Sequence, residues 1–149
     1  MTLLAHASRL PDPQVEPAFY DGVFVKRGIA WIVDIVIVTV LTTLASVLTF
    51  GVGFFLWPML FLGIGALYRI ATLASGSATW GMRLTGIELR GHDGARFDAL
   101  QAVFHVAGYY ASMITVVPAL ASVAAMMVTG RRQGLTDLIL GSAALNRPS

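Results

Sequence analysis

Residues 28–50, GIAWIVDIVIVTVLTTLASVLTF, decide the fold of this chain, and Asp34 is the one ionised side chain among them. The stretch is 23 residues long. A helix that rises about 1.5 Å per residue crosses the roughly 30 Å hydrocarbon core of a bilayer over such a length. The sequence therefore predicts a first transmembrane helix here.

Two further apolar stretches follow. Residues 54–74 carry Arg69 alone as a charged group, and the short connector 51–53 before them predicts an antiparallel hairpin. Residues 100–128 contain no Asp, Glu, Lys or Arg, and as a straight helix they would measure about 43 Å. Pro118 lies inside this third stretch, so a tilted helix, a kinked helix and two half-helices with a re-entrant part all remain open.

Composition agrees with a membrane protein. Hydrophobic residues make up 56% of the chain, charged residues 12%, and mean hydropathy is +0.75, whereas soluble domains carry roughly 25% charged residues. The ten basic residues are dispersed and form no clustered stripe, which argues against nucleic-acid binding. We predict an all-α membrane protein, a small bundle of three transmembrane segments in contact with the lipid bilayer.

The basic residues indicate an orientation. Lys26 and Arg27 precede the first span, and arginines recur in the loop 75–99, so the N-terminus and this loop are expected on the cytoplasmic side of an inner membrane. A third crossing would place the C-terminal tail, which begins with Arg131 and Arg132, on the outer side of the membrane, against the positive-inside rule. This conflict favours a third segment that turns back near Pro118, although the side of the C-terminus stays open.

The rest of the chain divides into three parts. We expect residues 1–26 to form a flexible cytoplasmic tail, residues 27–145 the transmembrane domain and residues 146–149 a short C-terminal tail. Residues 84–90 and 95–97 flank the turn sequence Gly91-His92-Asp93-Gly94, which predicts a small cytoplasmic β-hairpin. The C-terminal residues 141–145 could add a strand to it.

Three polar residues fall at matched depth inside the spans. Asp34, Arg69 and His105 each lie about 7–9 Å below the same predicted edge of the membrane. One interpretation is an ion pair between Asp34 and Arg69 that fixes helix packing; the other is a proton or cation site at Asp34. Arg27 would reach the lipid headgroups or pair with Asp137. Aromatic residues near the interfaces are interpreted as anchors: Trp31, Trp57, Tyr68 and Trp80.

The sequence lacks the constellations of known catalysis. It has no paired acid and base, no Ser/His/Asp set, no P-loop, no metal-binding histidine spacing and no cysteine. We therefore expect neither an enzyme nor a cofactor or metal site. Small residues line parts of the later spans, and such faces allow close helix contact. They are Gly63, Gly65, Ala71, Ser75, Ala107, Gly108, Ala111 and Ser112.

Three segments, in this order, together resemble the RDD family of small bacterial membrane proteins. The first is RGIAWIVD, residues 27–34, and the second is GSATWGMRLTGI, residues 76–87. The third is RRQGLTDLILG, residues 131–141. The residues that carry the resemblance are Arg27, Asp34, Gly76, Thr79, Gly81, Arg83, Gly86, Arg131, Arg132 and Asp137.

The resemblance implies a membrane fold, with transport proposed for the family and sodium–proton exchange suggested for some members. This chain departs from the pattern at His105, where the family often has arginine, and at Thr136, where a histidine is usual. Our first hypothesis is a non-enzymatic accessory or interaction subunit, in a homo-oligomer or a larger membrane complex. The alternative is an oligomeric sodium/proton-type transporter that uses Asp34.

Overall fold

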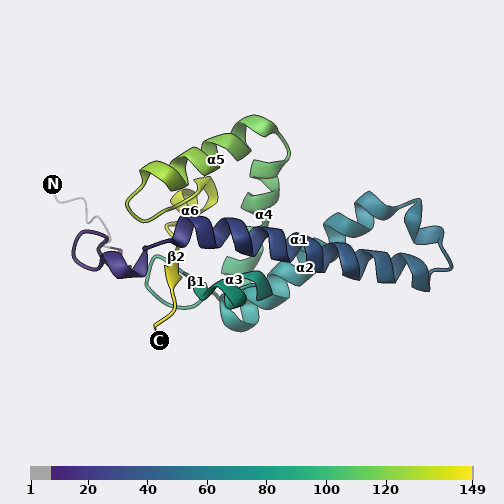
Figure 1. Cartoon of the computed structure of the whole chain (residues 1–149), viewed down its shortest axis with the longest axis horizontal. Helices are drawn as coiled ribbons and strands as arrows, with labels where there is room; N and C mark the ends of the chain where they lie inside the picture. The colour runs from purple at the N-terminus through teal and green to yellow at the C-terminus, as the bar shows by residue number, and fades with distance from the viewer. Residues whose placement is uncertain (1–7, 149) are drawn as a thin grey trace.

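The computed structural model describes residues 8–148. Helices dominate, and one small sheet joins distant parts of the chain (Figure 1). The elements are η1 (Pro17–Phe19), α1 (Val23–Leu48), η2 (Val52–Phe54), α2 (Trp57–Gly76), α3 (Trp80–Thr85), β1 (Ile87–Arg90), α4 (Ala99–Met113), α5 (Val116–Val128), α6 (Leu135–Leu140) and β2 (Ala143–Asn146).

The antiparallel hairpin of α1 and α2 is confirmed, and both helices are long and apolar enough to cross a membrane. α1 has 26 residues and is therefore about 39 Å long. The connector is longer than the predicted 51–53, because it runs over residues 49–56 and includes η2. It is also tightly packed, since a Cβ added at Gly53 would lie 2.7 Å from the Cα of Ser46.

The third apolar stretch is not a straight helix. It is broken into α4 and α5, whose axes differ by 117°. The break falls at Ile114 and Thr115, not at Pro118 as we expected. Pro118 instead occupies the first turn of α5, where the missing backbone N–H costs no hydrogen bond because no helical acceptor precedes it. Residues 8–148 thus contain two candidate spans, or three if the bent pair is one span.

The sheet also differs from the predicted hairpin. β1 pairs antiparallel with β2, with Leu89 opposite Ala144, so the C-terminal segment supplies the second strand. The turn at Gly91–Gly94 does form, and Gly94 adopts a φ of +77° that favours glycine. However, only the single bridge between Arg90 and Arg96 joins the predicted hairpin arms within the described residues.

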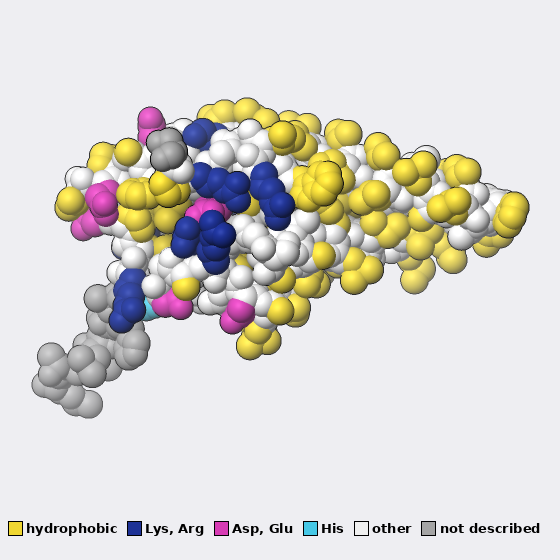
Figure 2. Space-filling view, turned by 90° about the horizontal axis from the view of Figure 1, so that it is seen from below, with side chains coloured by type: hydrophobic (Ala, Val, Ile, Leu, Met, Phe, Trp, Pro, Cys, Tyr) yellow, Lys and Arg dark blue, Asp and Glu magenta, His cyan; other side chains and the backbone are white. Residues whose placement is uncertain are grey.

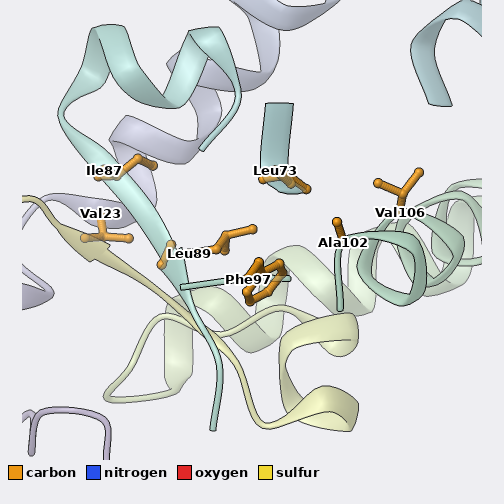
Figure 3. Close-up of a cluster of buried hydrophobic side chains, with 8 residues drawn as sticks. Val23, Leu73, Ile87, Leu89, Phe97, Ala102 and Val106 are labelled. Carbon is orange, nitrogen blue, oxygen red and sulfur yellow. The ribbon is translucent and has the colours of Figure 1, made fainter. Parts of the chain in front are cut away.

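The hydrophobic core lies where these segments meet, not between the long helices (Figure 3). Its buried members are Val23, Leu73, Ile87, Leu89, Phe97, Ala102, Val106 and Ala144. They come from the start of α1, the end of α2, both strands, the segment before α4, and α4 itself. This cluster therefore ties the start of α1, the central loop and the C-terminal region together.

We call this region the polar end and define it as residues 8–27, 77–98 and 129–148. Nine of the ten Lys and Arg residues belong to it, Arg69 being the tenth. In Figure 2, basic side chains gather at the broad end of the molecule, while hydrophobic side chains cover the narrow α1–α2 projection. Residues 8–22, expected as part of a tail, pack here with Leu10 and Tyr20 buried against β2. Residues 1–7 of that expected tail lie outside the described range.

Candidate functional site

Asp34 is buried on α1 and accepts three hydrogen bonds. Its Oδ1 accepts from the Tyr68 hydroxyl at 2.7 Å and from the Gly81 N–H at 3.0 Å. Its Oδ2 accepts from the Thr79 hydroxyl at 2.7 Å. All three donors are neutral, and two come from the start of α3. The carboxylate therefore clamps α3 onto α1.

Thr79 also caps α3, since its Oγ1 accepts the Met82 N–H at 3.2 Å. Thr79 thus links the helix end to the carboxylate. The clamp depends on a close approach at Gly81, because a Cβ there would overlap the backbone oxygen of Ala30 and lie 2.8 Å from Asp34 Oδ1. Only glycine allows the N–H of residue 81 to reach the acid.

The ion pair expected between Asp34 and Arg69 is absent from the described ion pairs, so that interpretation is wrong. Arg69 is buried, and its guanidinium lies 4.8 Å from the centre of the Tyr109 ring on α4. Its Nη1 also lies 3.4 Å from the carbonyl oxygen of Gly65. The two residues share a depth, but Asp34 faces α3 and Arg69 faces α4. Depth sets the axial position of a side chain, whereas the rotation of its helix sets its partner.

His105 belongs to a different group, centred on Asp137 of α6. Arg27 Nη1 lies 2.6 Å from Asp137 Oδ2, which confirms the pairing expected from the sequence. His105 Nδ1 lies 3.7 Å from Asp137 Oδ1, too far for a hydrogen bond, and has no other partner in the described part of the chain. The predicted polar layer is therefore divided among three separate sites.

Asp137 is fully buried, and its carboxylate is surrounded by groups that favour the charged form. Burial alone would raise the pKa of its carboxyl, but Arg27, His105 and the Gly134 N–H outweigh burial and hold that pKa below its usual value. Ser142 also donates to Asp137 Oδ1 at 3.1 Å. The carboxylate thus binds α1, α6 and the start of β2 together.

Cavities occur at the polar end. One of about 380 Å³ lies beside Tyr20, Gly22 and Arg132. Another, of about 210 Å³, is lined in part by Arg9, Glu88 and Arg90. Across residues 8–148, no group of three His, Cys, Asp or Glu side chains is placed to hold a metal ion.

Comparison with known protein families matches residues 22–141 to the model of the RDD family. The chain belongs to the RDD family. No curated protein and no solved structure matches it.

The three RDD segments, far apart in sequence, meet through α1. Asp34 of the first segment binds Thr79 and Gly81 of the second. Arg27, also of the first, binds Asp137 of the third. The arginine and the two aspartates of this RDD chain thus form two clamps, one for the central loop and one for the C-terminal region.

Other residues of the RDD segments act on helix ends. Arg83 Nε donates to the Ala78 carbonyl at 3.2 Å, and its guanidinium covers Gly76 at the end of α2. Gly86 ends α3 with a φ of +75°. Arg132 Nη1 donates to the Met127 carbonyl at 2.8 Å near the end of α5, while the Nε of Arg131 is buried without a partner in the described region.

The sequence does not predict two side-chain contacts at these sites, those of Tyr68 and Glu88. Tyr68 was interpreted as an interface anchor, but its hydroxyl binds Asp34; the shared depth of an aspartate and a tyrosine was the available signal. Glu88 was not singled out, although it is 2% exposed and contacts three arginines. The alternation Ile87-Glu88-Leu89-Arg90 places Glu88 on the strand face opposite Ile87 and Leu89, but it does not reveal burial by the C-terminus.

Proposed function

We propose that this RDD protein is a non-enzymatic, multi-pass membrane protein that acts by association, as an accessory or interaction subunit of a membrane complex. The observation that carries the proposal is an outward face of α2 made of Gly63, Leu67, Ala71 and Ser75. All four are exposed, and a Cβ added at Gly63 would meet no atom within 4 Å. Three of the four, Gly63, Ala71 and Ser75, are small, and small residues on one helix face let a second helix approach closely in a membrane.

The contrast with the inward glycines supports this reading. A Cβ at Gly65 would lie 2.8 Å from the Tyr110 hydroxyl, and one at Gly108 would lie 2.5 Å from Thr136 Cγ2. Those two glycines serve internal packing, whereas the outward face of α2 is left without an internal partner. The buried carboxylates of Asp34 and Asp137 and the partly buried Arg27 likewise serve internal contacts.

Purification of the full chain in mild detergent tests this proposal. We expect the wild type to elute as an assembly, with a partner protein or further copies of itself identified by mass spectrometry. Ala71→Leu and Gly63→Leu place bulk on the outward face and should release the monomer. Ala124→Leu is the matched control, because Ala124 is also exposed but lies on α5. A wild type that runs as a monomer without a partner contradicts the proposal.

A transporter is the second candidate, and one observation favours it. Asp34 is buried with neutral donors only, and such a carboxylate can take up a proton or cation. In this case Asp34→Asn would abolish cation-dependent proton flux in proteoliposomes while the protein stays inserted and folded. Wild-type flux no greater than that of empty vesicles, over a range of pH and salt, removes this candidate.

We also propose that the polar end faces the cytoplasm at the inner membrane. It contains nine basic residues, and by the positive-inside rule basic residues next to membrane spans are enriched on the cytoplasmic side. β2 pairs with β1, and Lys26 Nζ donates to Asn146 Oδ1 at 2.7 Å, so the C-terminus belongs with the central loop and the start of α1. On this view α4 and α5 enter and leave the membrane on one side, which removes the charge conflict.

A further inference from the structure

Three arginines converge on the single carboxylate of Glu88 at the polar end. Arg90 binds Oε1 through Nε at 2.7 Å and also through Nη2. Arg147 Nε lies 3.4 Å from Oε2, and Arg96 Nη2 lies 3.7 Å from the same atom. Glu88 is buried, so it holds three guanidinium groups together that would otherwise repel one another.

The charges of this cluster do not balance. Three arginines and one glutamate leave a net charge of +2 (3 − 1). Arg96 and Arg147 have side chains that are 63% and 36% exposed, so their remaining N–H groups face outward. An anion with several oxygens would satisfy them.

The cluster adjoins an apolar surface that fits a lipid interface. The Arg147 N–H donates to the carbonyl of Gly86, the residue that ends α3. On α3, Trp80 and Leu84 are 58% and 76% exposed and one helical turn apart. Figure 2 shows basic side chains close to the start of the hydrophobic surface. An exposed tryptophan near the boundary between polar and apolar surface is typical of the headgroup layer.

We propose that Arg96 and Arg147, arranged by Glu88, bind the phosphate of an anionic phospholipid headgroup. Arg90 donates to Glu88 and, through Nη1, to the Gly94 carbonyl at 3.3 Å, so it contributes its positive charge to the site. Guanidinium groups bind phosphate through two parallel N–H···O bonds, which makes arginine well suited to this task. Trp80 and Leu84 would contact the acyl region of the same lipid or its neighbour. The site is independent of whether the protein associates or transports.

Native mass spectrometry of the full chain in detergent tests the site, with phosphatidylglycerol and phosphatidylcholine of equal chain length as probes. We expect the wild type to bind phosphatidylglycerol in preference. Arg96→Gln should weaken that binding roughly 5-fold, and Arg96→Gln with Arg147→Gln about 25-fold, since each interfacial charge contributes about one such factor. Arg132→Gln, which removes the same charge outside the cluster, should keep the wild-type preference.

Three other outcomes would overturn the proposal. Equal binding of the two lipids by the wild type would show no anion site. Equal losses of phosphatidylglycerol binding in Arg96→Gln and Arg132→Gln would show a diffuse effect of net charge. Displacement of the lipid by inorganic phosphate at the same concentration would show a site for free phosphate. Arg96→Gln alone keeps the test valid if the double variant does not fold, because its exposed side chain lies at the edge of the cluster.

Discussion

At the scale of single residues, the two aspartates of this RDD chain differ in what they bind. Asp34 accepts hydrogen bonds from neutral groups, whereas Asp137 is paired with the guanidinium of Arg27. A buried charge that loses its partner costs far more than a surface charge, because the remaining ion is left without solvent. This difference gives Asp137 the larger expected effect on stability.

Asp137→Asn should lower the free energy of unfolding in detergent by about 3–5 kcal/mol, because it leaves the largely buried Arg27, whose side chain is 13% exposed, without its carboxylate partner. Asp21→Asn is the control, since Asp21 is exposed and its contact to Asn146 uses the backbone oxygen. Comparable losses in the two variants would contradict the assignment of Asp137 as a buried clamp.

The pH dependence of stability follows from the same pair. Folding lowers the pKa of Asp137 below its ordinary value of 3.8, so on acidification the unfolded chain takes up the proton first. The stabilisation is therefore complete above that value and is lost as the pH falls through the lower pKa of the folded state. We expect the free energy of unfolding of the wild type, measured from neutral pH to about pH 2, to fall more steeply than that of Asp137→Asn. Parallel curves would exclude this role.

At the scale of elements, the short helix α3 depends for its stability on contacts with other parts of the chain. Six residues make too few helical hydrogen bonds to be stable alone. Its start is fixed instead by the Thr79 cap and by Asp34, and its close approach to α1 requires the absence of a side chain at Gly81. The stability of α3 is thus a property of the α1–α3 contact.

Gly81→Ala should therefore destabilise the protein by about 1–3 kcal/mol, because the methyl group forces α3 away from Ala30 and Asp34. Gly28→Ala on α1 is the matched substitution, with no atom within 4 Å of the added Cβ. We expect it to be neutral or stabilising by up to about 1 kcal/mol, as helix propensity favours alanine. Thermal unfolding of both variants in detergent distinguishes the sites, and equal shifts would argue against the close approach.

At the scale of the whole molecule, the pairing of β1 with β2 decides where the C-terminus lies. Both strands belong to the polar end, so a chain that crossed the membrane a third time could not form this sheet. The 117° break between α4 and α5 supplies the reversal that the sheet requires. Break and sheet together predict two crossings and one re-entrant pair.

Single-cysteine labelling measures this arrangement, because the chain has no natural cysteine. We expect Ala95→Cys and Pro148→Cys to react with a membrane-impermeant maleimide from the same side, and Phe50→Cys from the opposite side. All three positions are exposed, Phe50 fully so. Reaction of position 148 from the side of position 50 would show a third crossing and contradict the model of a re-entrant pair.

The sequence by itself determined the membrane class, the α1–α2 hairpin and the RDD membership. It left the lipid headgroups and Asp137 as alternative partners of Arg27, and the structure decided for Asp137. Apolar length and charge counts are properties of the chain, and they report on burial in lipid without any knowledge of neighbours. Only the tertiary structure decided the partners of Asp34, Arg69 and His105, the break at residues 114–115 and the second strand of the sheet. These depend on how each helix is rotated and on contacts between residues far apart in sequence, such as Thr79 with Asp34 and Leu89 with Ala144. The depth of a side chain in the membrane follows from its position along the helix, but the side of the helix on which it finds a partner follows from tertiary packing.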